Sequence, residues 1–138
     1  MIRVALFLTL ATPALADPQF ENMSSTIPAH TYAGGWEHFV GGGVAVFDCN
    51  GDSLPELFLA GGEEPALFLR NDGNFAFSPA PFPEITRTTG AYPLDIDGDG
   101  HLDLYVMRAT GDVVLRGGPD CAFTDMTADL GITPDDKW

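Results

Sequence analysis

The fold of this chain is decided by a short acidic stretch with the sequence DIDGDGHLD, residues 95–103. Aspartates stand at its positions 1, 3, 5 and 9, and two glycines let the backbone curl between them. Apolar runs flank the stretch, GAYPL at residues 90–94 and LYVM at residues 104–107. Short apolar runs bounded by Gly and Asp indicate strands. The stretch therefore predicts two strands joined by a tightly curled acidic loop.

The same arrangement stands 47 residues earlier in the chain. The matching segments of the first unit are GVAVF (43–47), DCNGDSLPE (48–56), LFLA (57–60) and ALFLR (66–70), the last of which matches VVLR (113–116). The match continues at an offset of 46 through Ala76-Phe77 and Ala122-Phe123. So many matches in one order identify an internal repeat.

Each unit contains three or four strand-like runs and almost no helical periodicity, apart from one weak turn at residues 125–130. Four short strands every 40–50 residues are typical of β-propeller blades. The predicted fold class is therefore all-β, with two four-stranded repeats of an incomplete propeller. Since a propeller needs at least about four blades to close, we expect a fragment of a longer protein. The alternative is that partner subunits complete the ring.

The first 16 residues have the features of an export signal. Arg3 gives a basic start, residues 4–10 (VALFLTL) are apolar, and Ala14-Leu15-Ala16 has the small-x-small pattern of a cleavage site. We expect cleavage after Ala16, a secreted or periplasmic protein, and no membrane insertion afterwards, because the apolar run is too short to span a bilayer. The predicted organisation is then an N-terminal segment (17–35), a first repeat (36–89) and a second repeat (90–138) truncated before a third.

The charge of the chain excludes one class of partner. Among 138 residues, 20 are Asp or Glu and 6 are Lys or Arg, for a net charge of −14. Binding to nucleic acid phosphates needs clustered Lys and Arg, so we expect no nucleic-acid partner. A protein or glycan partner remains compatible with this composition.

The second acidic loop has the ligand pattern of a calcium site. Asp95, Asp97, Asp99 and Asp103 would supply carboxylates, and position 7, His101, would supply its backbone carbonyl. Carboxylates that converge without a cation repel one another, and Ca²⁺ fits such oxygen ligands better than Mg²⁺. The alternative is a surface turn of solvated Asp-Gly pairs.

The first loop follows the same pattern with fewer charges. Its predicted ligands are Asp48, Asn50, Asp52, Glu56 and the carbonyl of Leu54. Ser53 stands where glycine would ease the curl, and the loop has three charges against four, so we expect one Ca²⁺ per loop with weaker binding here. An EF-hand is excluded, because position 12 is Leu59 or Val106 instead of Glu.

The two cysteines, Cys49 and Cys121, would meet an oxidising compartment after export. They would form a disulfide if their Cα atoms lie close enough. The sequence leaves this open, since two small buried residues are the alternative.

The two units resemble FG-GAP/VCBS repeats, in which an apolar strand, a D-x-D/N-G-D-x-x-x-D/E loop and a second strand precede Leu-Arg and Phe. Residues 34–39 (GGWEHF), 47–52 (FDCNGD) and 123–127 (FTDMT) are most similar to the cartilage-acidic-protein-like (ASPIC/UnbV-associated) branch. The resemblance covers residues 34–133 and implies calcium-binding blades of a propeller like the seven-bladed integrin α-subunit head. It implies as ligands Asp48, Asn50, Asp52, Glu56, Asp95, Asp97, Asp99 and Asp103. The C-terminal module of that family is missing from this sequence, which again favours a fragment.

The predicted function is that of an exported calcium-binding propeller repeat protein with a structural or adhesion role, and not of an enzyme. The alternative is a secreted carbohydrate-active enzyme, a lyase or hydrolase, in which Glu37 and His38 do acid–base work. The chain has no nucleophile elbow, HExxH or phosphate-binding glycine motif. We expect Trp36 and Phe39 to pack and Glu37 and His38 to face solvent.

Overall fold

The computed structural model describes residues 17–133, so the predicted export signal at residues 1–16 lies outside the described residues, as do residues 134–138. The strands are β1 (Val44–Phe47), β2 (Glu56–Leu59), β3 (Leu67–Asn71), β4 (Phe77–Pro79), β5 (Thr88–Leu94), β6 (Asp103–Arg108), β7 (Val113–Gly118) and β8 (Ala122–Asp125). Three short 3₁₀ turns complete the elements: η1 (Ser24–Thr26), η2 (Trp36–His38) and η3 (Pro119–Cys121). Residues 17–133 contain no α-helix, and residues 127–131 form hydrogen-bonded turns. The prediction of an all-β chain is confirmed.

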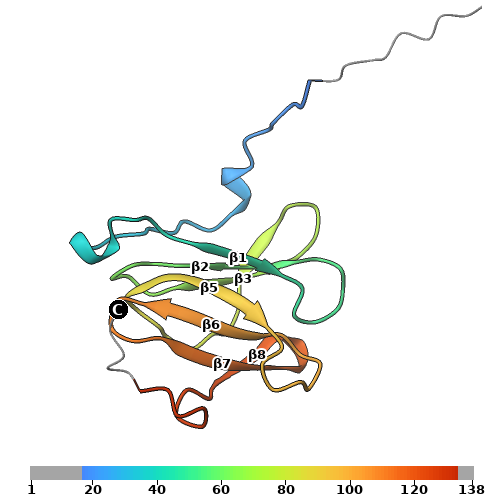
Figure 1. Cartoon of the computed structure of the whole chain (residues 1–138). Helices are drawn as coiled ribbons and strands as arrows, with labels where there is room; N and C mark the ends of the chain where they lie inside the picture. The colour runs from blue at the N-terminus through green and yellow to red at the C-terminus, as the bar shows by residue number, and fades with distance from the viewer. Residues whose placement is uncertain (1–16, 134–138) are drawn as a thin grey trace, which may run out of the picture.

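The strands form two four-stranded antiparallel sheets, β1-β2-β3-β4 and β5-β6-β7-β8, in each of which neighbours in space are neighbours in sequence. Figure 1 shows them as two layers, with residues 17 into the twenties extending away. The strand pairing repeats between the sheets: Phe47 of β1 faces Glu56 of β2, and 47 residues later Leu94 of β5 faces Asp103 of β6. Farther out, Arg70 faces Ser78 as Arg116 faces Thr124, 46 residues later. The predicted repeat thus coincides with the two sheets, although β5 begins at Thr88, two residues before the expected boundary.

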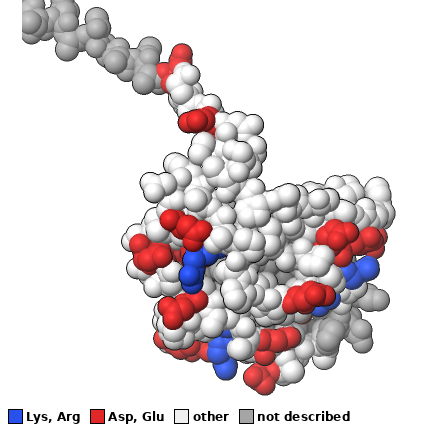
Figure 2. Space-filling view, turned by 180° about the vertical axis from the view of Figure 1, so that it is seen from behind, with Lys and Arg blue, Asp and Glu red and all other residues white. Residues whose placement is uncertain are grey.

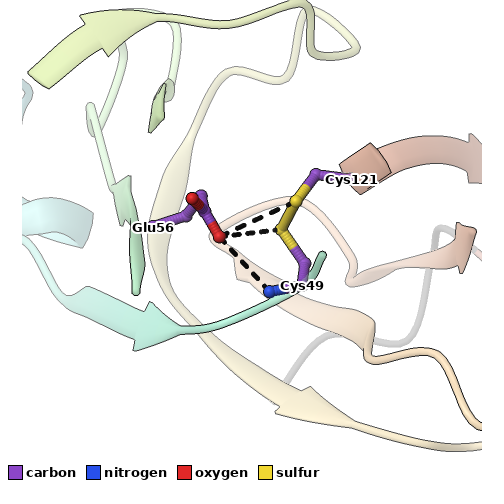
Figure 3. Close-up of side chains that lie close together, drawn as sticks. All are labelled: Cys49, Glu56 and Cys121. Carbon is purple, nitrogen blue, oxygen red and sulfur yellow. Dashed lines mark hydrogen bonds between the residues drawn. A yellow bond between two sulfur atoms is a disulfide. The ribbon is translucent and has the colours of Figure 1, made fainter. Parts of the chain in front are cut away.

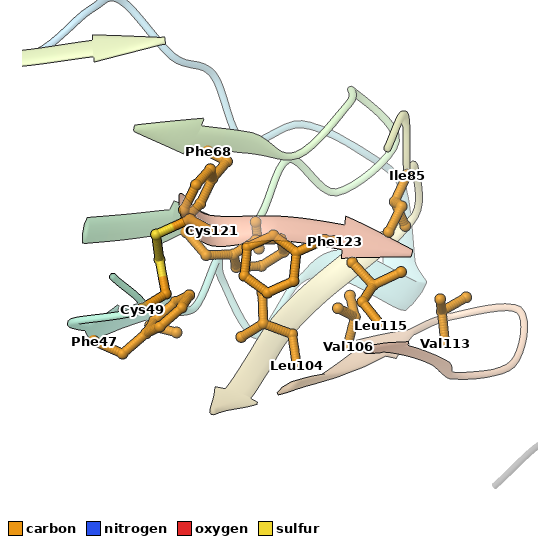
Figure 4. Packing of buried hydrophobic residues seen from close by; sticks show 13 residues of the cluster. Phe47, Cys49, Phe68, Ile85, Leu104, Val106, Val113, Leu115, Cys121 and Phe123 are labelled. Carbon is orange, nitrogen blue, oxygen red and sulfur yellow. A yellow bond between two sulfur atoms is a disulfide. The ribbon is translucent and has the colours of Figure 1, made fainter. Parts of the chain in front are cut away.

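The core lies between the two sheets (Figure 4). Its centre is a group of four phenylalanines whose ring centroids lie 5.2 to 6.3 Å apart: Phe47, Phe68, Phe82 and Phe123. Strand alternation places Phe47 and Ala45 in this core and leaves Val44 and Val46 more than half exposed. Each of the four rings therefore belongs to one continuous contact between the blades.

A glycine pair lets the first strands of the two sheets touch. The Gly43 N–H donates to the Thr89 carbonyl at 2.8 Å. A Cβ on Gly43 would lie 2.9 Å from the Cα of Gly90, the residue at the equivalent repeat position. Any side chain at residue 43 would therefore push β1 away from β5. The described residues form two packed blades and no closed ring, and no helix among them is long and apolar enough to cross a bilayer.

Candidate metal centre

Both acidic loops connect the first two strands of a sheet. The first loop joins β1, which ends at Phe47, to β2, which begins at Glu56. The second joins β5, which ends at Leu94, to β6, which begins at Asp103. The two loops border one hollow of about 380 Å³, which η3 also lines. Both predicted metal sites therefore lie at the same end of the molecule.

The carboxylate at position 1 curls each loop around itself. Asp48 accepts hydrogen bonds from the N–H groups of Gly51 (2.7 Å) and Ser53 (2.9 Å). Asp95 accepts the equivalent bonds from Gly98 (2.8 Å) and Gly100 (3.2 Å). The pKa of Asp48 is lowered most by the hydrogen bond from the Ser53 N–H and less by the bond from the Gly51 N–H, because both bonds favour the ionised carboxylate.

The side chains at loop positions 3 and 5 also accept hydrogen bonds from the backbone of their own loop. Their side-chain oxygens accept backbone N–H bonds from the second residue onward: Asn50 from Asp52 (3.0 Å), Asp52 from Leu54 (2.8 Å), Asp97 from Asp99 (3.2 Å) and Asp99 from His101 (2.8 Å). Such side-chain-to-backbone bonds are Asx turns. The two loops thus share one backbone path as well as one sequence pattern.

The second loop gathers negative charge at the surface. One carboxylate oxygen from each of Asp95, Asp97 and Asp99 lies within 4.8 Å of the others. Arg116 offsets part of this charge, since its Nε donates to Asp97 at 2.9 Å. In the first loop the amide of Asn50 donates to Asp52 at 2.9 Å instead. Three hard oxygen donors in so small a space fit a divalent cation with oxygen ligands.

The position-9 acids lie apart from these exposed carboxylates. Asp103 is fully buried, and its two oxygens accept the N–H groups of Ile96 and Gly117, each at 2.8 Å. Glu56 is 1% exposed, and its Oε2 accepts the Cys49 N–H at 3.3 Å, the equivalent of the Ile96 bond. Each residue therefore ties the base of its loop to the sheet, a role that the ligand pattern alone does not indicate.

Glu56 also lies against a disulfide. Cys49 and Cys121 are bonded, with Cα atoms 5.2 Å apart, so the bridge joins the first loop to η3 of the second sheet. Figure 3 shows the Glu56 carboxylate facing both sulfurs, with Oε2 at 3.3 and 3.7 Å. Burial raises the pKa of Glu56, the charges of Asp52 and Asp48 raise it further, and Oε1 has no hydrogen-bond partner. The pairing that the sequence left open is thus present.

One comparison with known proteins found a match. Residues 48–106 match the family model described as FG-GAP-like repeat. The match supports an FG-GAP repeat protein. The match begins at Asp48 of the first loop and ends in β6, so the FG-GAP-like repeat spans both acidic loops. No curated protein and no solved structure matches the chain.

The structure corrects the expectation for residues 36–39, just before the FG-GAP-like repeat. Trp36 and Phe39 are 80% and 66% exposed and stack on each other with centroids 4.5 Å apart, whereas His38 is 2% exposed. The physical reason is Gly34, whose missing side chain leaves room for the imidazole: a Cβ there would lie 2.6 Å from His38 Nδ1. Glu37 does face solvent, as expected, and pairs with Arg87 at 3.0 Å. The glycines before Trp36 were the signal for a buried side chain.

Proposed function

We propose that this chain is an exported calcium-binding β-propeller repeat protein with a structural or interaction role. The observation that carries the proposal is the group of Asp95, Asp97 and Asp99 oxygens within 4.8 Å of one another, on a loop whose hydrogen bonds recur 47 residues earlier. Bound Ca²⁺ would neutralise this group and hold the first two strands of each blade together. The binding free energy would then add to the folding free energy.

The loops offer one cation site each. In the second, Asp95, Asp97 and Asp99 with the His101 carbonyl would hold Ca²⁺, and in the first, Asp48, Asn50 and Asp52 with the Leu54 carbonyl. The other two predicted ligands, Glu56 and Asp103, lie apart from these groups and would support the sites by holding the base of each loop to its sheet. The second site would be the tighter one, because its exposed group has three carboxylates against two.

Export is supported by the disulfide. A bond between Cys49 and Cys121 persists in an oxidising compartment and is rare in the cytosol. The predicted signal before Asp17 agrees with this location. We propose a protein or glycan as the partner, since the net charge of −14 disfavours nucleic acid. Figure 2 shows acidic side chains in several groups over one face, with few basic ones among them.

An enzymatic role for Glu37 and His38 is disfavoured by burial. A general acid or base must come within hydrogen-bond reach of its substrate, and His38 is 2% exposed. Loss of glycan lyase or hydrolase turnover in His38→Ala, with unchanged stability, would support the enzymatic alternative instead.

Calcium binding is tested by calorimetric titration and by thermal melting with and without EDTA. We expect chelation to lower the Tm by several degrees, and Asp97→Ala to have a low Tm even in excess Ca²⁺, because an acid of the carboxylate group is missing. Asp129→Ala, which removes an exposed acid outside both loops, is the matched control and should behave as wild type. An unchanged Tm in EDTA together with no heat of Ca²⁺ binding would refute the proposal.

A further inference from the structure

A second group of metal-binding side chains lies beside η2, outside both acidic loops. One carboxylate oxygen each of Glu37 and Glu63 and one ring nitrogen of His38 lie within 4.8 Å of one another. Glu37 and His38 belong to η2, while Glu63 stands on the turn between β2 and β3. Segments 25 residues apart thus bring an imidazole and two carboxylates to one place.

His38 is an unusual member of this group because it is buried and unpartnered. The side chain is 2% exposed, and neither Nδ1 nor Nε2 has a hydrogen-bond partner. Buried polar atoms without a partner are uncommon in native proteins and cost stability. Tyr32 packs its ring edge-on against the imidazole, with centroids 6.3 Å apart, and offers it no hydrogen bond. A metal ion bonded to one ring nitrogen would give that buried atom a partner.

The two carboxylates face a common space. A Cβ on Gly35 would lie 3.2 Å from Glu37 Oε2 and 4.0 Å from Glu63 Oε1, so the glycine keeps this space open. Arg87 donates to the other oxygen of Glu37, Oε1, at 3.0 Å and leaves Oε2 free. A charged partner that orients a carboxylate in this way is a common outer-shell contact of metal ligands.

The backbone around the group is held firmly. The Glu63 N–H donates to the Ala33 carbonyl at 2.8 Å, and the Gly62 N–H donates to the Thr88 carbonyl at 3.0 Å. The backbone therefore holds these donors in place before any ion arrives.

We propose that Glu37, His38 and Glu63 bind a transition-metal dication, for which Zn²⁺ is the best match. One imidazole and two carboxylates suit Zn²⁺, whereas Ca²⁺ takes oxygen ligands alone. Both cysteines are in the disulfide, so no thiolate competes for the ion. Three protein ligands leave a fourth position for water or for a group of a partner molecule. The proposal is independent of calcium binding at the loops.

Titration of the full chain with Zn²⁺ in saturating Ca²⁺ tests this site. We expect one Zn²⁺ per chain, with an affinity that falls at least tenfold in Glu63→Gln. Glu64→Gln is the matched control, because it changes the adjacent exposed glutamate outside the group, and it should bind as wild type. Equal affinity in both variants, or an equal loss in both, would overturn the proposal.

Nitrogen NMR of the three histidines gives a second readout without a buried substitution that could unfold the chain. In ¹⁵N-histidine-labelled wild type, Zn²⁺ should shift a ring nitrogen of His38. His30, whose Nε2 is bonded to the Ala60 carbonyl, and His101 of the second loop should keep their shifts. A shift of His101 with none at His38 would place Zn²⁺ at the acidic loop and contradict the assignment.

Discussion

Ser53 occupies a backbone conformation that its repeat equivalent reaches with glycine. The φ of Ser53 is 66° and that of Gly100 is 88°, both in the left-handed region. A side chain in this region costs roughly 1–2 kcal/mol, a cost that glycine avoids. We expect Ser53→Gly to raise the free energy of unfolding by about 1 kcal/mol, measured by urea denaturation in EDTA. Gly100→Ser should lower it by a similar amount, and a loss of stability in Ser53→Gly would contradict this account.

Glu56 makes stability depend on pH. Its pKa is raised above the ordinary 4.5, chiefly by burial. Since a raised native pKa means that the native state holds the proton more tightly, its contribution is fully present below the unfolded pKa and is lost as pH rises through the native pKa. In EDTA we therefore expect Glu56→Gln to melt a few degrees above wild type at pH 7.

The pH profile of that variant is the check. Its advantage over wild type should shrink as pH falls and disappear well below pH 4.5, where Glu56 is protonated in both states. A variant that melts lower than wild type at pH 7 would show that the charged carboxylate, through its bond to the Cys49 N–H, stabilises the native state.

Among the elements, β3 contributes Phe68 to the core between the sheets. Its ring contacts Phe47, Phe82 and Phe123, and the side chain is 2% exposed. Deleting a buried phenylalanine ring costs about 3–5 kcal/mol, from lost transfer free energy and from the cavity. We expect this loss in Phe68→Ala by chemical denaturation. Phe20→Ala, at a side chain that is 94% exposed, should change stability by less than about 0.5 kcal/mol, and equal losses would contradict the assignment of the core.

The strands and loops could be predicted from sequence because their signals are local. Apolar runs between Gly and Asp indicate β1, β2 and β5 to β7 without reference to the rest of the fold. The internal repeat then indicates which strands of the two sheets correspond. The positions of His38 and Asp103 depend on packing and hydrogen bonds that follow no regular spacing. Gly34 and Tyr32 lie against the His38 ring, and the Gly117 N–H on β7 donates to one oxygen of Asp103. Such contacts produce no regular spacing in the amino-acid sequence, so the sequence does not predict the group of Glu37, His38 and Glu63.

At the scale of the whole molecule, the disulfide joins the two blades across 72 residues. In the chain-entropy model a closed loop of this length stabilises by roughly 4 kcal/mol. We expect the double variant Cys49→Ala/Cys121→Ala to lose about this amount in urea denaturation. Dithiothreitol should destabilise wild type similarly and leave the double variant unchanged. Equal effects of the reductant on both would mean that it acts elsewhere.

The meander order of the strands has a consequence for how the chain folds. Since each strand pairs with its neighbour in sequence, most contacts within a sheet close short loops, and chains of low contact order fold fast. Each blade is thus able to form soon after its last strand leaves the ribosome. The Gly43–Gly90 approach and the ring contacts between the sheets come later, because they require both blades. Docking of two preformed units, and not strand pairing, would then set the overall folding rate.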